Sequence, residues 1–119
     1  MRSGAVLIAL AASGAAAAPA APGRYDAELC VATAPQAAPS CGGADVEVAP
    51  GRINVRVADI VYRLALRGAQ LDVETMHGRM QIDEFSAAYD WAGTTLRFSD
   101  AAKEVRYEVR IGARRSAGR

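Results

Sequence analysis

Hydrophobic and polar residues alternate along most of the chain between Ile60 and Ile111, and the alternation breaks where tight turns are expected. A period of two is typical of strands that bury one face. Two-residue turns fix which side chains share a face, so the turns can be tested against the pattern. Four turns keep one apolar face inside throughout: Arg67-Gly68, His77-Gly78, Ala92-Gly93 and the loop Asp100 to Lys103. The pattern therefore predicts a continuous antiparallel meander.

The first of these turns sets the register of the first hairpin in the meander. It places Leu64 opposite Leu71 on the apolar face and Arg63 opposite Asp72 on the other face. Cross-strand pairs of opposite charge on an exposed face are typical of an antiparallel sheet with one wet side. We therefore expect both leucines in the core and the charged pair at the surface.

The second turn gives Met80 an inward position and Met76 an outward one. Further along, Ile82 and Phe85 both point inward although they are three residues apart, which breaks strict alternation. A β-bulge near Asp83-Glu84 would restore the phase and bend the strand, as closure of a small barrel requires. A second irregularity, between Val57 and Ile60, is interpreted as another bend.

The part of the chain before the meander also reads as strands. Tyr25 to Val31 alternates and predicts a first strand, and Thr33 to Gly43, with two prolines and two glycines, predicts a loop. Asp45 to Val48 and Ile53 to Val57 form a hairpin about Pro50-Gly51. The predicted fold class is all-β, a small antiparallel meander of about eight short strands that closes into a barrel or a strongly curled sandwich.

The N-terminus has the features of a secretory signal peptide. One early arginine is followed by an apolar stretch from Ala5 to Ala12 and by small residues with an Ala-x-Ala pattern. The apolar stretch is far shorter than the roughly 20 residues that a membrane span needs. We predict a signal peptide at 1–20, a single β domain at 21–113 and a basic flexible tail at 114–119. The expected location is periplasmic or secreted.

The chain has two cysteines, Cys30 and Cys41, which bracket the predicted loop. In an oxidising compartment such a pair is expected to form a disulfide. Closing so short a loop stabilises the fold by roughly 2–3 kcal/mol in the chain-entropy model. The alternative is a redox or metal-binding thiol pair, but ten intervening residues fit neither CxxC nor a zinc knuckle.

Charge and motifs exclude several classes of function. The 119 residues carry a net charge of +1, which predicts no attraction to nucleic acid or to membrane surfaces. The sequence has one histidine, His77, and no Gly-x-Ser-x-Gly, phosphate loop or HExxH. His77 is interpreted as a residue of a hairpin tip. We therefore expect neither an enzyme nor a cofactor, and we expect a partner among exported or envelope proteins.

Two groups of side chains could nevertheless hold a metal. Met76, His77 and Met80 offer soft ligands of the kind that copper(I) prefers, but the register sends the two sulfurs to opposite faces. Asp72 and Asp83 come out directly opposite each other on the outer face, where two carboxylates can bind calcium or transfer protons. The alternative is an exposed pair that Arg63 neutralises.

The aromatic residues fall mainly on the inner face. Tyr62, Phe85 and Tyr89 would line the interior, which keeps open a carrier of small ligands. Trp91 lies next to the Ala92-Gly93 tip, at the rim of a barrel. Since tryptophan is enriched at interface hot spots, Trp91 and His77 are the candidate binding residues.

The run Ser86-Ala87-Ala88-Tyr89, followed by Trp91, resembles in part the Ser-Gly-x-x-Tyr loop of small exported barrels that inhibit bacterial cell-wall lysozymes. The glycine and the Lys-Gly of that family are absent, and the run falls in a predicted strand. The resemblance therefore implies an assay for lysozyme inhibition. The leading hypothesis is a non-enzymatic exported binding module, with a small-ligand carrier and a lysozyme inhibitor as alternatives.

Overall fold

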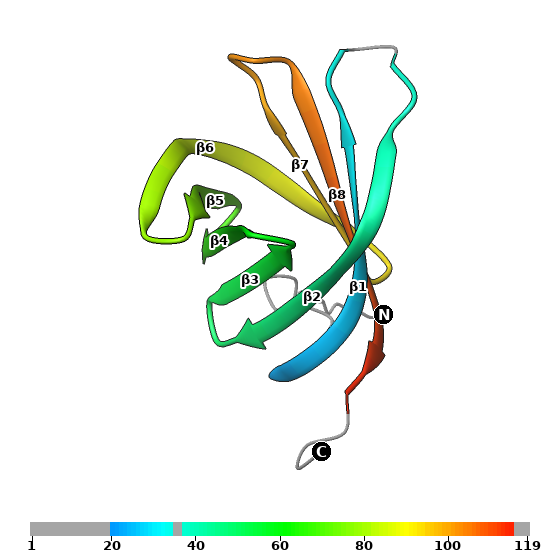
Figure 1. Ribbon diagram of the computed structural model, residues 1–119. Helices are drawn as coiled ribbons and strands as arrows, with labels where there is room; N and C mark the ends of the chain where they lie inside the picture. Colours follow the sequence, from blue (N-terminus) through cyan, green and yellow to red (C-terminus); the bar gives the residue numbers. More distant parts are fainter. Residues whose placement is uncertain (1–19, 35–36, 116–119) are drawn as a thin grey trace, which may run out of the picture.

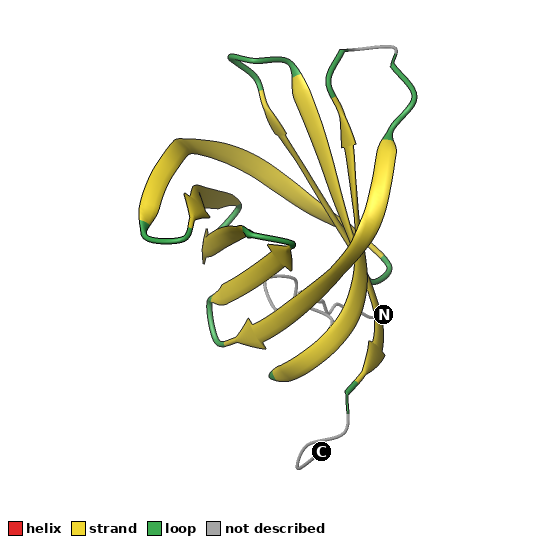
Figure 2. Ribbon diagram, in the orientation of Figure 1, coloured by secondary structure: helices red, strands yellow, loops and turns green. Residues whose placement is uncertain are grey.

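Eight antiparallel strands form a closed barrel in a computed structural model that describes residues 20–34 and 37–115 (Figure 1). Each strand pairs with its neighbours in sequence, and the last strand closes on the first. No helix occurs in these residues (Figure 2). The strands are β1 (Gly23–Ala32), β2 (Ser40–Ala49), β3 (Arg52–Val57), β4 (Ile60–Arg67), β5 (Gln70–His77), β6 (Met80–Ala92), β7 (Thr95–Asp100) and β8 (Val105–Arg114). The all-β class, the barrel and the strand number are confirmed.

The hairpin between β2 and β3 has the predicted turn and register. Pro50-Gly51 connects the strands, with Val48 opposite Ile53. Gly51 has a φ of 72°, which proline followed by glycine supplies at low cost in a type II turn. A Pro-Gly pair thus fixed both the place of the turn and the face of each strand.

The glycine turns of the meander lie one residue further along than predicted. They are Gly68-Ala69, Gly78-Arg79 and Gly93-Thr94. In each, the first loop residue has a positive φ, between 61° and 64°, and the second does not, as in a type II′ turn. The register therefore moves by two residues, and Leu64 lies opposite Val73 instead of Leu71. Because the shift is even, both leucines still point inward, and both are buried.

A hairpin turn replaces the predicted bend between Val57 and Ile60. These two residues pair directly, and Ala58-Asp59 forms the loop between β3 and β4. Ala58 has a φ of 52°, a conformation that alanine adopts only at a cost. The turn lacks glycine, proline and asparagine at its first position, so the sequence gives little sign of it.

The predicted bulge is present, but the prediction of which methionine is buried is wrong. Thr75 lies opposite Asp83 while Met76 lies opposite Gln81, so Ile82 is the extra residue. Met76, predicted at the surface, is 9% exposed, whereas Met80 and Ile82, predicted inside, are 63% and 51% exposed. The shifted turn moves Met80 to the tip of the hairpin, opposite His77, where no core lies beneath it.

At one end of the barrel the β1–β2 and β7–β8 hairpins extend beyond the remaining strands (Figure 1). β2 begins at Ser40, so the two glycines assigned to the preceding loop lie in a strand. Near the C-terminus, β8 continues to Arg114, one residue past the predicted domain boundary. The next residue, Arg115, forms ion pairs with Asp26 and Asp45. The predicted signal peptide falls almost entirely outside the described residues, as do residues 116–119.

Side chains from all eight strands fill the barrel. Burying each large aliphatic side chain stabilises the fold by about 1.5–3 kcal/mol. The buried core consists of Tyr25, Leu29, Val46, Val48, Ile53, Val55, Leu64, Leu71, Val73, Ala87, Leu96, Phe98, Val109 and Ile111. The predicted inner face is thereby confirmed for most of its members.

Candidate functional site

The loops of the meander alternate between the two ends of the barrel. The β1–β2, β3–β4, β5–β6 and β7–β8 loops share one end, and the other three lie at the opposite end with the first residue of β1 and the last of β8. His77 and Trp91, the two predicted binding residues, are therefore at opposite ends. The structure does not bring them into one site.

The β5–β6 tip, defined here as residues 77–82, carries the main exposed apolar surface. Met80 and Ile82 are the large hydrophobic residues that stand exposed in the described part of the chain. His77, also exposed, ends β5 directly opposite Met80. The turn residue Arg79 adds a positive charge. An apolar pair beside a cation and an imidazole is a surface that can contact another protein.

Trp91 is a rim residue of the core. Its side chain shares the inner face with Leu96, directly across on β7, and packs half-buried against the core. The indole Nε1 is buried and has no hydrogen-bond partner among the described atoms. Most of the ring is therefore committed to packing, and its N–H is not presented at the surface.

A polar cluster lies at the end of the barrel that carries the β5–β6 tip. The Nζ of Lys103, from the β7–β8 loop, is 2.9 Å from Oδ2 of Asp83 on β6, whose side chain is 25% exposed. The hydrogen bond from Lys103 lowers the pKa of the Asp83 carboxyl, against burial, and the backbone N–H of Glu84 lowers it further. Asp83 is thus held ionised and paired.

Two tyrosines lie beside this ion pair. Burial raises the pKa of Tyr107 to about 12, with smaller contributions from Tyr62, Asp100 and Asp83. Burial also raises the pKa of Tyr62. The Tyr107 ring stacks on Phe98 at a centroid distance of 4.9 Å. Neutral phenols stacked in this way pack the mouth and are poor general bases at neutral pH.

The predicted pairing of Asp72 with Asp83 is wrong. Asp72 lies opposite Ser86, which donates a hydrogen bond of 2.7 Å to its Oδ1, and it forms an ion pair of 2.9 Å with Arg67. Arg63, the predicted partner of Asp72, is instead 3.4 Å from Glu74. The two-residue change of register and the bulge separate the carboxylates, so no shared site for calcium or proton transfer results.

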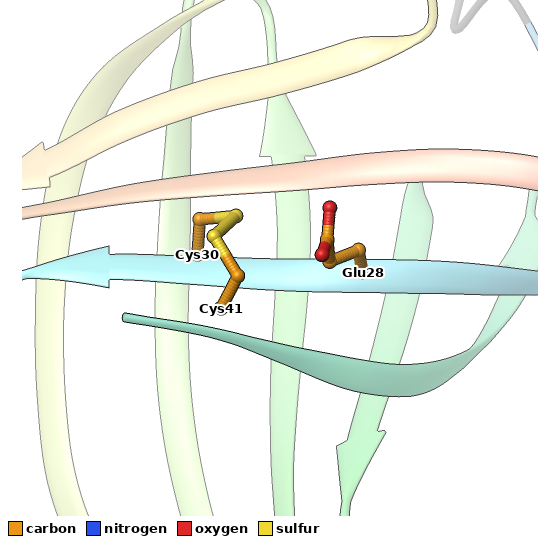
Figure 3. Close-up of side chains that lie close together, drawn as sticks. All are labelled: Glu28, Cys30 and Cys41. Carbon is orange, nitrogen blue, oxygen red and sulfur yellow. A yellow bond between two sulfur atoms is a disulfide. The ribbon is translucent and has the colours of Figure 1, made fainter. Parts of the chain in front are cut away.

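The disulfide between Cys30 and Cys41 is present, as predicted, and joins directly opposed residues of β1 and β2. Glu28 lies on the same side of these strands (Figure 3). A carboxylate and two cysteine sulfurs so close together could bind a metal only if the sulfurs were free thiolates. Both sulfurs are instead joined in the disulfide. The Glu28 carboxylate instead forms an ion pair of 3.2 Å with Arg110.

The interior offers little room for a ligand at its centre. Val55, Leu71, Val73 and Leu96 have no exposed surface and come from three different strands, β3, β5 and β7. Tyr62, Phe85 and Tyr89, the predicted cavity lining, pack against this core. An apolar hollow of about 470 Å³ does occur at the end of the barrel away from the β5–β6 tip. It lies between the β2–β3 and β4–β5 turns, and Tyr89 lines it.

Comparisons with protein-family models, with curated proteins and with solved structures find no match for the chain. The described residues contain no helix long and apolar enough to cross a membrane. The run that resembles the loop of the lysozyme inhibitors lies in β6, as expected. There Ser86 donates to Asp72, and the Tyr89 hydroxyl donates to the carbonyl oxygen of Gly68 at 2.7 Å.

Proposed function

We propose that this protein is a non-enzymatic binding module, exported to the periplasm or secreted, that contacts an exported or envelope protein through the β5–β6 tip. The observation that supports the proposal most is the exposure of Met80 and Ile82 on one hairpin. All other large aliphatic side chains in the described residues are at least partly covered. Contact with a partner would bury this surface and gain about 25 cal/mol per Å².

The local structure favours the tip over the opposite end as the contact. The bulge at Ile82 turns that side chain out of the sheet, and bulges commonly redirect a side chain at a functional site. The tip is carried by the paired strands β5 and β6, so it is presented on a rigid support. Much of the surface of Trp91, at the opposite end, is buried against the core.

Site-specific photo-crosslinking in the producing cell tests the proposal. A benzophenone amino acid at position 80 should yield one reproducible adduct with an envelope protein, whereas the same group at Ala69, on the turn at the opposite end, should not. Adding Ile82→Ser should abolish the adduct at position 80 without changing the circular dichroism spectrum. Equal adducts from both positions, or none from either, would contradict the proposal.

A small-ligand carrier is the second candidate, because of the apolar hollow between the β2–β3 and β4–β5 turns. Native mass spectrometry of protein purified without detergent should then detect a co-purifying apolar molecule. Substituting a residue of the lining, Leu66→Gln, should remove that molecule. Inhibition of a cell-wall lysozyme is a special case of the binding module and is tested directly with purified enzyme.

A further inference from the structure

The strand β6 is left with an unpaired edge along much of its length. It pairs with β5 from Met80 to Ala88, but with β7 over only four residue pairs, from Tyr89 to Ala92. Figure 1 shows β6 turning away from β7 beyond this point. We call the resulting opening, between residues 84–88 of β6 and residues 99–103, the seam. No strand of the described part of the chain fills it.

The backbone groups that face the seam follow from the alternation of an antiparallel strand. The N–H of Tyr89 donates to the carbonyl oxygen of Ala69, on the side of β5. The N–H and C=O groups of Ser86 therefore point the opposite way, into the seam, and those of Ala88 point the same way at the end of the seam where pairing with β7 begins. The N–H of Glu84, which also faces it, bonds the side chain of Asp83 at 2.9 Å. An exposed edge of this kind can pair with another chain.

The seam is also hollow enough for a polypeptide backbone. A groove of about 770 Å³ runs along it between β6 and the β7–β8 hairpin. Small side chains of both walls, including Ser86, Ala88 and Ser99, line this groove, and the rings of Phe98 and Tyr107 contribute to it. Small walls beside unpaired backbone groups suit an extended segment, which adds to a sheet edge through main-chain hydrogen bonds.

The charges of the groove indicate the chemistry of that segment. Arg97 is held by two hydrogen bonds to Asp90, and Glu108 is neutralised by Arg110. Arg106 remains, and within the described residues its guanidinium donates only to the carbonyl oxygen of Ala37, at 3.3 Å. One positive charge without a carboxylate partner therefore lines the groove, which favours an acidic occupant.

We propose that the seam binds an extended acidic peptide segment of a partner protein, which adds to the edge of β6 as a further strand and places a carboxylate against Arg106. The proposal rests on the binding module proposed above and names a second contact and its partner class. The ion pair between Lys103 and Asp83 spans the seam at the tip end and holds its walls together.

Binding of the purified, disulfide-intact protein to an array of random ten-residue peptides tests this. The bound peptides should be poor in proline and should contain at least one acid. Ala88→Pro removes an N–H that faces the seam just beyond the last residue pair with β7, and proline is tolerated at such edge positions. It should weaken binding of the selected peptides at least tenfold, whereas the matched control Ala88→Thr, which keeps the N–H, should not.

A second variant keeps the test decisive if Ala88→Pro fails to fold. Arg106→Gln should remove the preference for acidic peptides while neutral peptides bind as before. Unchanged binding by Ala88→Pro, or an acid preference that survives Arg106→Gln, would overturn the proposal. So would a concentration-dependent dimer in sedimentation that Ala88→Pro abolishes, because the occupant would then be a second copy of the chain.

These experiments test the proposal for the seam and the proposal for the tip independently. Loss of the crosslink at position 80 with intact peptide binding would refute the tip as a contact and leave the seam. Peptide binding that no seam variant alters, together with an intact crosslink, would refute the seam alone.

Discussion

Removing the disulfide should take away a large part of the stability of the domain. Cys30 and Cys41 are 11 residues apart in sequence, and the chain-entropy model gives about 3 kcal/mol for closing a loop of this length. A domain of about 100 residues has a total stability of roughly 5–15 kcal/mol. The double variant Cys30→Ala, Cys41→Ala should therefore remain folded at 25 °C with a clearly smaller margin.

Alanine is the appropriate replacement because Cys30 is 1% exposed, and a serine hydroxyl there would add the cost of a buried polar group. With a urea m-value of about 1–2 kcal/mol/M, the midpoint should fall by about 2 M. The measurement is urea denaturation followed by the fluorescence of Trp91 and by far-UV circular dichroism. The untreated and the reduced wild-type protein provide the control, and the reduced protein should match the double variant.

A loss below about 1 kcal/mol with an unchanged m-value would refute the loop-closure reasoning. It would mean that the β1–β2 hairpin retains its structure in the unfolded chain, so that the bond constrains little. Hydrogen exchange separates these cases, because loop closure acts on the whole unfolding equilibrium, whereas a local effect would expose only the amides of β1 and β2 near the bond.

Four further predictions follow from burial and backbone geometry. Ala58→Gly should stabilise the protein by about 0.5–1 kcal/mol in thermal or urea unfolding, because it relieves a φ of 52° at a small cost in chain entropy. Leu64→Ala, at a position 1% exposed, should cost about 3–5 kcal/mol, whereas Met80→Ala should cost almost nothing. In a spectrophotometric titration at 295 nm, Tyr107 should ionise only near pH 12; since burial raises its folded pKa above the unfolded value of 10.0, stability should be full below pH 10 and decline as pH rises toward 12. The pKa of Asp83 is lowered, so its contribution is present above the unfolded pKa of 3.8 and should be lost as pH falls further; Asp83→Asn should abolish that part of the acid dependence.

The alternating pattern was sufficient to predict the fold class, because an inner face of apolar residues recurs in every strand. It predicted the register only to within two residues. A glycine with positive φ can stand at either position of a two-residue turn, and both choices keep the same face inside. The pair Val48 and Ile53 was predicted correctly since proline followed by glycine allows one arrangement.

That remaining freedom explains the errors at the candidate sites. A shift of two residues leaves Leu64 in the core, but it changes the cross-strand partners of the charged side chains on β4, β5 and β6, and the pairing of Asp72 with Asp83 depended on the exact register. The exposure of Met80 and the presence of the seam could not be predicted from the sequence either. Alternation identifies the two faces of a strand and does not reveal where a strand leaves its neighbour.

The order of events during folding follows from the closure of β1 on β8. Every other strand pairs with the next strand in the chain, but Leu29 pairs with Val109, about 80 residues later. Hairpins of neighbouring strands form in microseconds, whereas a contact across such a distance must first overcome the entropy of the intervening chain. Because the chain is made from its N-terminus onward, β1 and β2 are complete and their disulfide can form long before β8 exists. Until β8 arrives, the edge of β1 is open to other chains, so we expect aggregation during production to depend on how fast the last ten residues of the sheet follow the rest.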